Sequence, residues 1–206
     1  MVEQIKKTAA YGPQPISERV LDVMAQVPRH ELVPREARAA AYLDTPLPIG
    51  DGQTISQPYI VALMTELADV QPNEKVLEVG TGSGYQAAVL SGLAANVYTI
   101  EIVVRLGRTA AAALARLGYR NVEVKIGDGY GGWPEHAPFD AIVITAAPKE
   151  IPAALVDQLA PGGKLVAPVG GSSFEQQLTV LEKDRDGKIS KREVLPVRFV
   201  PLVRGH

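Results

Sequence analysis

Glycines and carboxylates follow one another closely between Val76 and Glu101, and their spacing could hold a nucleotide. Gly80, Gly82 and Gly84 recur at every second position between a β-branched run and an alanine-rich segment. Glycine lets the backbone approach a ligand closely, and the free N–H groups at the start of the next helix would face it. Glu101 closes the next apolar run, where a carboxylate can accept hydrogen bonds from both hydroxyls of a ribose. We therefore expect a nucleotide cofactor on this βαβ unit.

The spacing of these glycines distinguishes two kinds of nucleotide. A dinucleotide-binding fingerprint needs glycine at its first, third and sixth positions, but the sixth position counted from Gly80 is Tyr85. The pattern instead resembles the first motif of methyltransferases that use S-adenosylmethionine (SAM). On this resemblance the cofactor contacts in the motif are Glu78, Gly80, Thr81, Gly82, Ser83 and Gly84. A tight strand-to-helix turn that binds nothing is the alternative.

Another acidic side chain follows the predicted strand 122–126. Asp128 and Gly129 come directly after its carboxyl end. In an open α/β sheet ligands bind at the carboxyl ends of the strands, which places Asp128 to accept a hydrogen bond from the amino group of an adenine. An Asp-Gly turn without a ligand would explain the same residues, and both interpretations stay open.

The segment 42–59 contains the residue that we expect to lie nearest the chemistry. It is rich in proline and glycine, which predicts an irregular loop laid over the domain. Ser56 in this loop has two interpretations: the N-cap of a helix that begins at Pro58, or a hydroxyl that faces the reactive end of the cofactor. His30, in the connector 27–34, is a further candidate, or else a histidine that is hydrogen-bonded to backbone.

The composition restricts the chemistry to oxygen groups and a cofactor. The 206 residues include no cysteine, which excludes disulfides and thiol catalysis, and only three scattered histidines, which argues against a metal site. The 21 basic and 23 acidic residues form no long run, so we expect no nucleic-acid partner. No signal peptide or membrane-spanning run is visible, so we expect a cytoplasmic protein without a membrane partner.

Apolar periodicity and turn residues predict the elements that position these side chains. A serine-capped helix is expected at 17–27, and an extended connector at 27–34, because proline disfavours helix in the residue before it. The other predicted helices are 58–69, 86–94, 103–117 and 151–159. The predicted strands are 76–80, 97–101, 122–126, 139–145, 164–169, the hairpin 178–182 with 188–194, and a closing strand 197–203.

Motifs along nearly the whole chain resemble those of the protein-L-isoaspartate O-methyltransferase family. Beside the glycine motif they are 27–30, 46–50, 54–58, 127–129, 140–147 and 197–202. The segments 54–56 and 200–202 are more specific than the glycine motif, and they fall in the right order. One departure is Ile102, because the family usually has an arginine directly after the ribose-binding acid.

The resemblance implies a fold and a domain organisation. The fold is α/β, that of a Rossmann-like class I SAM-dependent methyltransferase. It has a mostly parallel, seven-stranded, doubly wound sheet and an N-terminal helical and loop segment. Residues 1–206 would form a single domain. Within it, 1–70 carry the N-terminal helix and substrate-side loop, 71–170 the SAM-binding core, and 171–206 the C-terminal hairpin and strand.

The resemblance also implies an activity. A methyl group would pass from SAM, leaving S-adenosyl-L-homocysteine (SAH), to the free carboxyl of L-isoaspartyl residues in damaged proteins and peptides. D-aspartyl residues are left open as substrates. The ester then collapses to a succinimide, which can reopen to normal aspartate, so the reaction would begin a repair. A monomer is favoured.

The roles of single residues follow from the same resemblance. Ser56 would be the catalytic residue. The peptide would be contacted by Thr54, Ile55, Ser56, Val200, Pro201 and Leu202. A carboxylate is already ionised at neutral pH, so methyl transfer to it needs alignment and exclusion of water rather than a general base or a metal.

Three rival interpretations stay open at this point. A small-molecule or RNA methyltransferase would share residues 78–101 but would bring a base or a basic groove. An NAD-dependent reductase would want glycine at position 85. A non-catalytic SAM-binding regulator would bind the cofactor without turnover.

Overall fold

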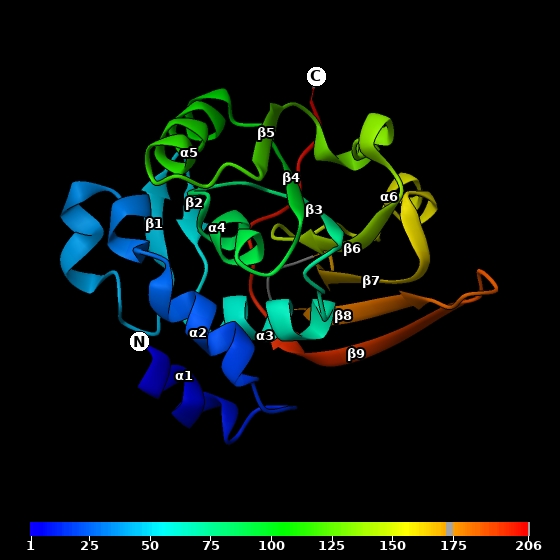
Figure 1. Ribbon diagram of the computed structural model, residues 1–206, viewed down its shortest axis with the longest axis horizontal. Coiled ribbons are helices and arrows are strands. Elements are labelled where there is room, and N and C mark those ends of the chain that lie inside the picture. The colour runs from blue at the N-terminus through cyan, green and yellow to red at the C-terminus, as the bar shows by residue number, and fades with distance from the viewer. Residues whose placement is uncertain (172–174, 206) are drawn as a thin grey trace.

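The computed structural model describes residues 1–171 and 175–205, and one seven-stranded sheet lies at its centre (Figure 1). Across the sheet the strands run in the order β5-β4-β3-β6-β7-β8-β9. Their bounds are β3 Lys75–Val79, β4 Asn96–Glu101, β5 Val122–Ile126, β6 Phe139–Ile144, β7 Leu159–Val169, β8 Gln176–Lys183 and β9 Ile189–Val197. Strands β3 to β7 pair in parallel, whereas β8 is antiparallel to both β7 and β9. The predicted mostly parallel, seven-stranded sheet is confirmed.

The central strands are apolar because both of their faces are covered. Successive residues of a strand point to opposite faces, so Val76 packs into the hydrophobic cluster on one face and Leu77 into the cluster on the other. The same alternation places Ala141 on the first face and Ile142 on the second. Burial on both faces is what produces the near-continuous apolar runs seen in the sequence.

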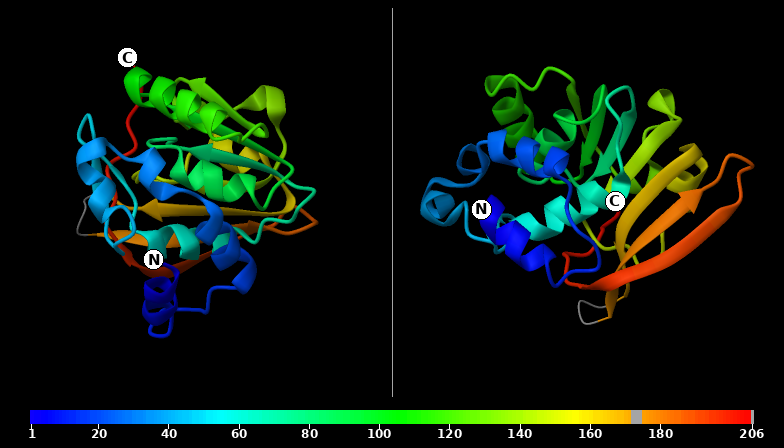
Figure 2. Two further views of the ribbon diagram at one scale, coloured as in Figure 1. Left: turned by 60° about the vertical axis from the view of Figure 1, so that its left-hand side comes forward. Right: turned by 60° about the horizontal axis from the view of Figure 1, so that its bottom comes forward.

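Helices α1 to α5 cover one face of the sheet in two layers. They are α1 Val2–Ala9, α2 Glu18–Gln26, α3 Pro58–Ala68, α4 Tyr85–Ser91 and α5 Val104–Arg116. Helices α3, α4 and α5 contact the strands, and α1 and α2 pack onto α3. Figure 2 shows the N-terminal helices on the side of the molecule away from the tip of the β8–β9 hairpin.

The opposite face has a thinner cover. It consists of α6 Ala153–Asp157 with the short 3₁₀ segments η3 Gly129–Gly131 and η4 Pro134–His136. Trp133 and Leu155 supply the buried side chains that pack on this face. Helix α6 is shorter than the predicted 151–159, because Leu159 already pairs with Phe139 as the first residue of β7.

The connector 27–34 is not extended throughout, which corrects the prediction. Val27 and Val33, the residues before the two prolines, are extended as expected. Between them the chain makes the 3₁₀ helix η1 Arg29–Leu32, followed by η2 Arg35–Ala40. A proline fixes its own φ and restricts the residue before it. It does not restrict residues 29–32, which were therefore free to turn.

The predicted irregular loop 42–59 contains a small β-hairpin, which is a second correction. Strands β1 Leu47–Gly50 and β2 Gln53–Ile55 pair antiparallel. Residues 50–52 make the connecting turn, in which Gly50 has φ 94° and Gly52 has φ 71°. The glycines that suggested irregularity supply two of the positive φ values of this turn, and Asp51 between them has φ 51°.

The predicted closing strand 197–203 is wrong as a regular element. Strand β9 already ends at Val197. Beyond it, the segment 200–202 makes one bridge to Ala147, whose N–H donates to Val200 O and whose carbonyl accepts from Leu202 N, both at 2.8 Å. The segment therefore crosses the carboxyl end of β6 instead of lengthening the sheet, because it pairs with the loop after that strand.

Candidate active site

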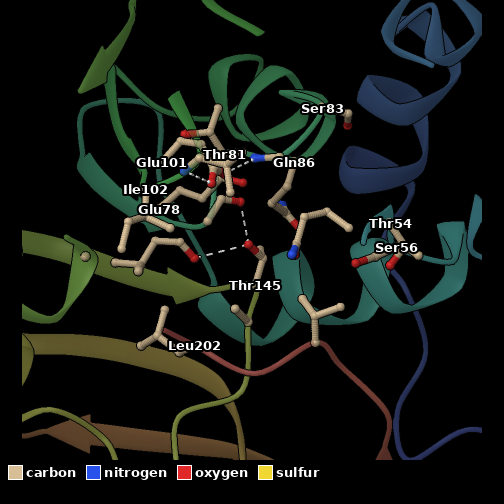
Figure 3. Close-up of a pocket in the computed structure, with 18 of the residues that line it drawn as sticks. Thr54, Ser56, Glu78, Thr81, Ser83, Gln86, Glu101, Ile102, Thr145 and Leu202 are labelled. Atoms are coloured by element: carbon tan, nitrogen blue, oxygen red, sulfur yellow. Dashed lines mark hydrogen bonds between the residues drawn. The ribbon is translucent and has the colours of Figure 1, made fainter. Parts of the chain in front are cut away.

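A cavity of about 80 Å³ lies where β3, β4 and β6 end. Its walls come from three distant parts of the chain, namely residues 53–56, the turns after these strands, and residues 200–203. Figure 3 shows Thr54 and Ser56 on one side of this cavity, Glu78, Thr81 and Glu101 on another, and Thr145 between them. Folding thus assembles the site from segments that the sequence separates by more than a hundred residues.

The glycine-rich turn is held in place by the end of β6. Gly80 has φ 103°, and a Cβ there would lie 2.5 Å from Thr145 Oγ1, so only glycine fits. The Thr145 hydroxyl donates to two backbone carbonyls, Gly80 O at 2.6 Å and Val79 O at 3.1 Å. Thr145 therefore fixes the backbone that forms the floor of the cavity.

Glu101 lies at the carboxyl end of β4 as predicted, and its carboxylate also supports the turn. Oε2 accepts from Gly82 N at 2.7 Å and Oε1 accepts from Val103 N at 2.9 Å. The side chain lines the cavity and is only 6% exposed. Each carboxylate oxygen has two acceptor sites, so one on each oxygen remains for a ligand.

Glu78 is fully buried in the wall of the cavity. The Thr99 hydroxyl donates to its Oε2 at 2.5 Å, and Oε1 has no partner among the described residues. The pKa of Glu78 is raised to about 8, mainly by burial; the hydrogen bond from Thr99 opposes this rise, and the nearby charge of Glu101 adds to it. The carboxyl is therefore mostly neutral at pH 7.

The remaining motif residues keep the turn in shape. Thr81 Oγ1 contacts Thr99 Oγ1 at 2.7 Å, and Ser83 Oγ accepts from Tyr85 N at 3.2 Å where α4 begins. Gly84, with φ 84°, is the residue before that helix. Thr81, Gly82 and Ser83 line the cavity.

Ser56 lines the cavity and is not the cap of α3. The residue at the N-cap position is Gln57, and the first turn is held by Asp44, whose Oδ1 accepts from Tyr59 N at 2.8 Å. The Ser56 hydroxyl makes no hydrogen bond within the part of the chain that the structure describes. The N-cap interpretation is therefore wrong, because a carboxylate from another segment takes that place.

Asp128 lies beside the cavity, and its carboxylate already has partners. Oδ1 accepts from Tyr130 N at 2.8 Å, which caps η3, and Oδ2 accepts from Gly205 N at 3.1 Å. Gly129, the next residue, does line the cavity. The local turn is thus present, and an adenine contact would have to compete with Gly205 for Oδ2 or use the second acceptor site of that oxygen.

A second cavity of about 610 Å³ adjoins the first. It runs past the end of β9 and the start of α3, and includes Val197 and Ile60 in its walls. The residues that line both cavities are Thr54, Ser56, Thr145 and Val200. Ile55, Pro201 and Leu202 line the first, so every predicted substrate residue lies on one of the two walls.

Several lining residues were not singled out from the sequence. Thr145 ends β6, and the rule that ligands bind at the carboxyl ends of strands would have found it. Gln86 directly follows the glycine motif and carries a buried Oε1 without a partner among the described residues. Ile102, which the sequence did single out as a departure from the family, lines the cavity beside Glu101. His30 lies outside both cavities and contacts Tyr42 Oη at 2.6 Å, a side chain and not backbone.

The described residues lack two features that would point to other functions. They contain no group of three or more histidine, cysteine, aspartate or glutamate residues that could hold a metal ion. They also contain no helix with the length and apolar character needed to cross a bilayer.

The fold and the site together define a class I SAM-dependent methyltransferase. The parallel β5-β4-β3-β6-β7 order, the glycine turn after β3 and the acid at the end of β4 are its defining features here. A solved protein-L-isoaspartate O-methyltransferase superposes with a TM-score of 0.83 at 29% identity, covering 98% of this chain. The chain spans 65% of the length of that protein.

The particular family follows from the sequence comparison. The sequence model of the protein-L-isoaspartate(D-aspartate) O-methyltransferase (PCMT) family matches residues 2–206. Protein-L-isoaspartate O-methyltransferase 1 of Cupriavidus necator is 58% identical, over 100% of this chain and 82% of that protein. A Plasmodium falciparum beta-aspartate methyltransferase (PCMT), solved in complex with SAH, has a TM-score of 0.80 at 28% identity and covers 92% of each chain. The chain belongs to the PCMT family.

Proposed function

We infer that this protein transfers a methyl group from SAM to the free carboxyl of L-isoaspartyl residues in damaged proteins and peptides, which begins their repair through a succinimide. Family membership over residues 2–206 supports the activity. The observation that carries it is the junction of the two cavities, where Thr54, Ser56, Thr145 and Val200 line both walls. A cofactor in the first cavity and a peptide in the second would meet at that junction.

The residues of the first cavity fit SAM. Gln86 Oε1 is a buried acceptor without a partner among the described residues, which suits the ammonium group of the amino-acid part, and Glu78 Oε1 would become a second acceptor once the carboxyl loses its proton beside that ammonium. Glu101 would hold the ribose through its remaining acceptor sites, and Gly80 to Gly84 would contact the amino-acid part. Asp128 and Gly129 are proposed at the adenine. Once bound, SAM supplies an electrophilic methyl on a sulfonium.

Methyl transfer to a carboxylate does not require the protein to transfer a proton. The acceptor is ionised at neutral pH, so no side chain has to remove a proton. What the chain must do is align the acceptor with the methyl and keep water out. The small volume of the first cavity suits that task.

Ser56 is proposed to position the acceptor. Its hydroxyl lies at the junction and has no hydrogen-bond partner among the described residues, so it can donate to the isoaspartyl carboxylate. A hydroxyl cannot act usefully as a base toward a group that is already anionic. Its contribution would be orientation, through one charge-assisted hydrogen bond.

The peptide is proposed to bind partly through its backbone. Damaged sites occur in many sequences, so the enzyme cannot depend on neighbouring side chains. Beyond β9 the segment 198–202 forms no regular strand, and its residues 198–200 line the second cavity together with Thr54. Gln176 and Ala147 already bind several backbone groups of this segment, and the groups that they leave could pair with a peptide as an added strand does.

The domain organisation, location, oligomeric state and partners of the protein are also proposals. Residues 1–206 are proposed to form one domain, since one sheet carries both hydrophobic clusters. A single calorimetric unfolding transition is the matching measurement. A cytoplasmic monomer without nucleic-acid partners is consistent with the near-balanced charge, and light scattering with added RNA would test it.

The deciding experiment compares two peptides that differ in one linkage. Purified protein is given SAM with a labelled methyl group and either an isoaspartyl peptide or its normal aspartyl twin. Base-labile label on the isoaspartyl peptide alone is the expected result, and a D-aspartyl peptide serves as a third substrate. Binding of SAM without transfer to any peptide would instead favour a non-catalytic regulator, and label on both twins would reject the specificity.

A further inference from the structure

Arg29 is a fully buried arginine that has no carboxylate partner. Its exposed fraction is 0%, and none of the ion pairs among the described residues includes it. Its guanidinium lies 4.5 Å from the centre of the Tyr85 ring. Nη1 is buried without any hydrogen-bond partner in the described part of the chain.

Burying a charged side chain without a paired carboxylate is energetically unfavourable, so the position of Arg29 needs an explanation. Removing an arginine from water without a paired carboxylate carries a large desolvation penalty. Burial accordingly lowers the pKa of Arg29 to about 10, although the neighbouring Tyr85 opposes this. The side chain still carries its positive charge at neutral pH.

The hydrogen bonds of Arg29 point to one segment of the active site. Nη2 donates to the backbone carbonyl of Ser56 at 2.8 Å, and Nε donates to Ala41 O at 2.8 Å. The two carbonyls lie 15 positions apart in the sequence, and the rigid planar guanidinium sets the distance between them. Arg29 itself lines neither cavity.

We propose that Arg29 is a positioning residue of the methyl-transfer reaction, which holds the Ser56 carbonyl so that the Ser56 hydroxyl faces the junction of the two cavities. This inference rests on the proposed role of Ser56. A charged donor on the carbonyl of Ser56 restrains the backbone on one side of the hydroxyl, while Asp44 restrains the helix on the other through Tyr59 N. The hydroxyl is thereby left fixed and without a partner of its own.

Arg29→Lys is the informative substitution. A lysine keeps the charge, but its single ammonium cannot reproduce the fork that spans two carbonyls. We expect kcat/KM for an isoaspartyl peptide to fall about tenfold or more. The Kd for SAH, measured by calorimetry, should change by less than about twofold, because Arg29 does not line the cavity and a lysine keeps a cation beside Tyr85, the lining residue that Arg29 contacts. Rates are expressed per molecule that binds SAH, so partial unfolding does not imitate lost activity.

A double-mutant cycle separates positioning from a general effect on folding. If Arg29 acts through the Ser56 hydroxyl, then adding Arg29→Lys to Ser56→Ala should lower kcat/KM by less than about a further twofold. Independent, additive losses would overturn the proposal. Arg19→Lys is the matched control, because Arg19 donates to the backbone carbonyl of Val70 far from both cavities. It should lower the melting temperature and leave kcat/KM unchanged.

The failure of this inference differs from the failure of the proposed function. A wild-type protein that methylates no isoaspartyl peptide would reject the function itself. An active wild type with additive losses would reject only the role of Arg29. If Arg29→Lys does not fold, the cycle is run with Arg29→Gln, which keeps N–H donors on a shorter side chain. Loss of SAH binding in both variants would show that Arg29 serves the whole fold, and would overturn the proposal.

Discussion

The Ser56 hydroxyl is the polar group that we expect to contact the acceptor carboxylate. Removing it in Ser56→Ala should lower kcat/KM by roughly ten- to 150-fold, the equivalent of one hydrogen bond to a charged group at about 1.5 to 3 kcal/mol. Because Ser56 does not cap α3, the free energy of unfolding should change by less than about 0.5 kcal/mol. Single-turnover methyl transfer and thermal unfolding measure the two effects. A less stable variant with full activity per folded molecule would contradict this assignment.

Glu101 has two tasks, and its substitution should show both. In Glu101→Ala, loss of two charge-assisted contacts to the ribose should weaken SAH binding roughly a hundredfold or more. Stability should fall as well, because the N–H groups of Gly82 and Val103 lose their acceptor. Calorimetry that finds unchanged SAH affinity would reject the ribose placement.

Glu78 should make stability depend on pH. Its pKa is raised from 4.5 to about 8 in the folded protein. Between these values the unfolded chain loses a proton that the folded chain keeps, so the free energy of unfolding should fall as pH rises through this window. Glu78→Gln removes that effect. Urea unfolding at pH 5 and pH 8 should therefore show the wild type losing stability relative to the variant at the higher pH; equal pH profiles would contradict a neutral buried Glu78.

Residues with a motif signal could be placed from the sequence, and those without one could not. Gly80 and Glu101 stand at fixed positions relative to strand ends, so their location followed from spacing alone. Arg29 stands in the motif 27–30, but its burial had no signal, because arginine is normally exposed and nothing local marks this one as buried. The partners of Asp128 were likewise hidden, since Gly205 approaches it only through the path of the folded chain.

At the scale of elements, Asp44 anchors the helix that follows Ser56. Its Oδ1 accepts from Tyr59 N, and its Oδ2 accepts from Thr8 Oγ1 at 3.0 Å and Gln57 Nε2 at 3.2 Å. Asp44→Ala should therefore lower the free energy of unfolding by about 1 to 2 kcal/mol or more, the cost of a lost cap. Chemical denaturation measures this. Asp157→Ala, an exposed aspartate of α6, should cost far less, and equal losses in the two variants would contradict the anchoring role.

Elements with a regular period could be predicted, and those fixed by distant contacts could not. Helix α2 has an apolar face and a serine cap, and Ser17 does accept from Val20 N. Strand β1, the first strand of the hairpin with β2, has four residues, of which one is proline and one is glycine. Both residue types are disfavoured in strands, so residue propensities do not predict this hairpin. The path of residues 200–202 depends on Ala147, more than fifty positions away, and no local pattern encodes that contact.

At the scale of the whole molecule, three separate segments enclose one small site. The cavity at the strand ends measures about 80 Å³, below the range of roughly 300 to 1,000 Å³ usual for pockets that hold small ligands. A ligand of the size of SAM must therefore move the walls apart when it enters. Of these walls, residues 200–203 are held mainly by the bridge to Ala147, by Tyr130 Oη, which donates to Leu202 O at 3.2 Å, and by Gly205 N on Asp128.

Because Val200 borders both cavities, the two ligands should be thermodynamically linked. Whichever ligand arrives first meets the free-energy cost of displacing the shared wall, and the second does not meet it again. Each should then raise the affinity for the other by the same factor, as reciprocity of binding free energies requires. Calorimetric titration of SAH with and without a saturating isoaspartyl peptide, and of the peptide with and without SAH, measures the factor from both sides. A factor of one would mean that neither ligand displaces the wall for the other, so that the two cavities fill independently.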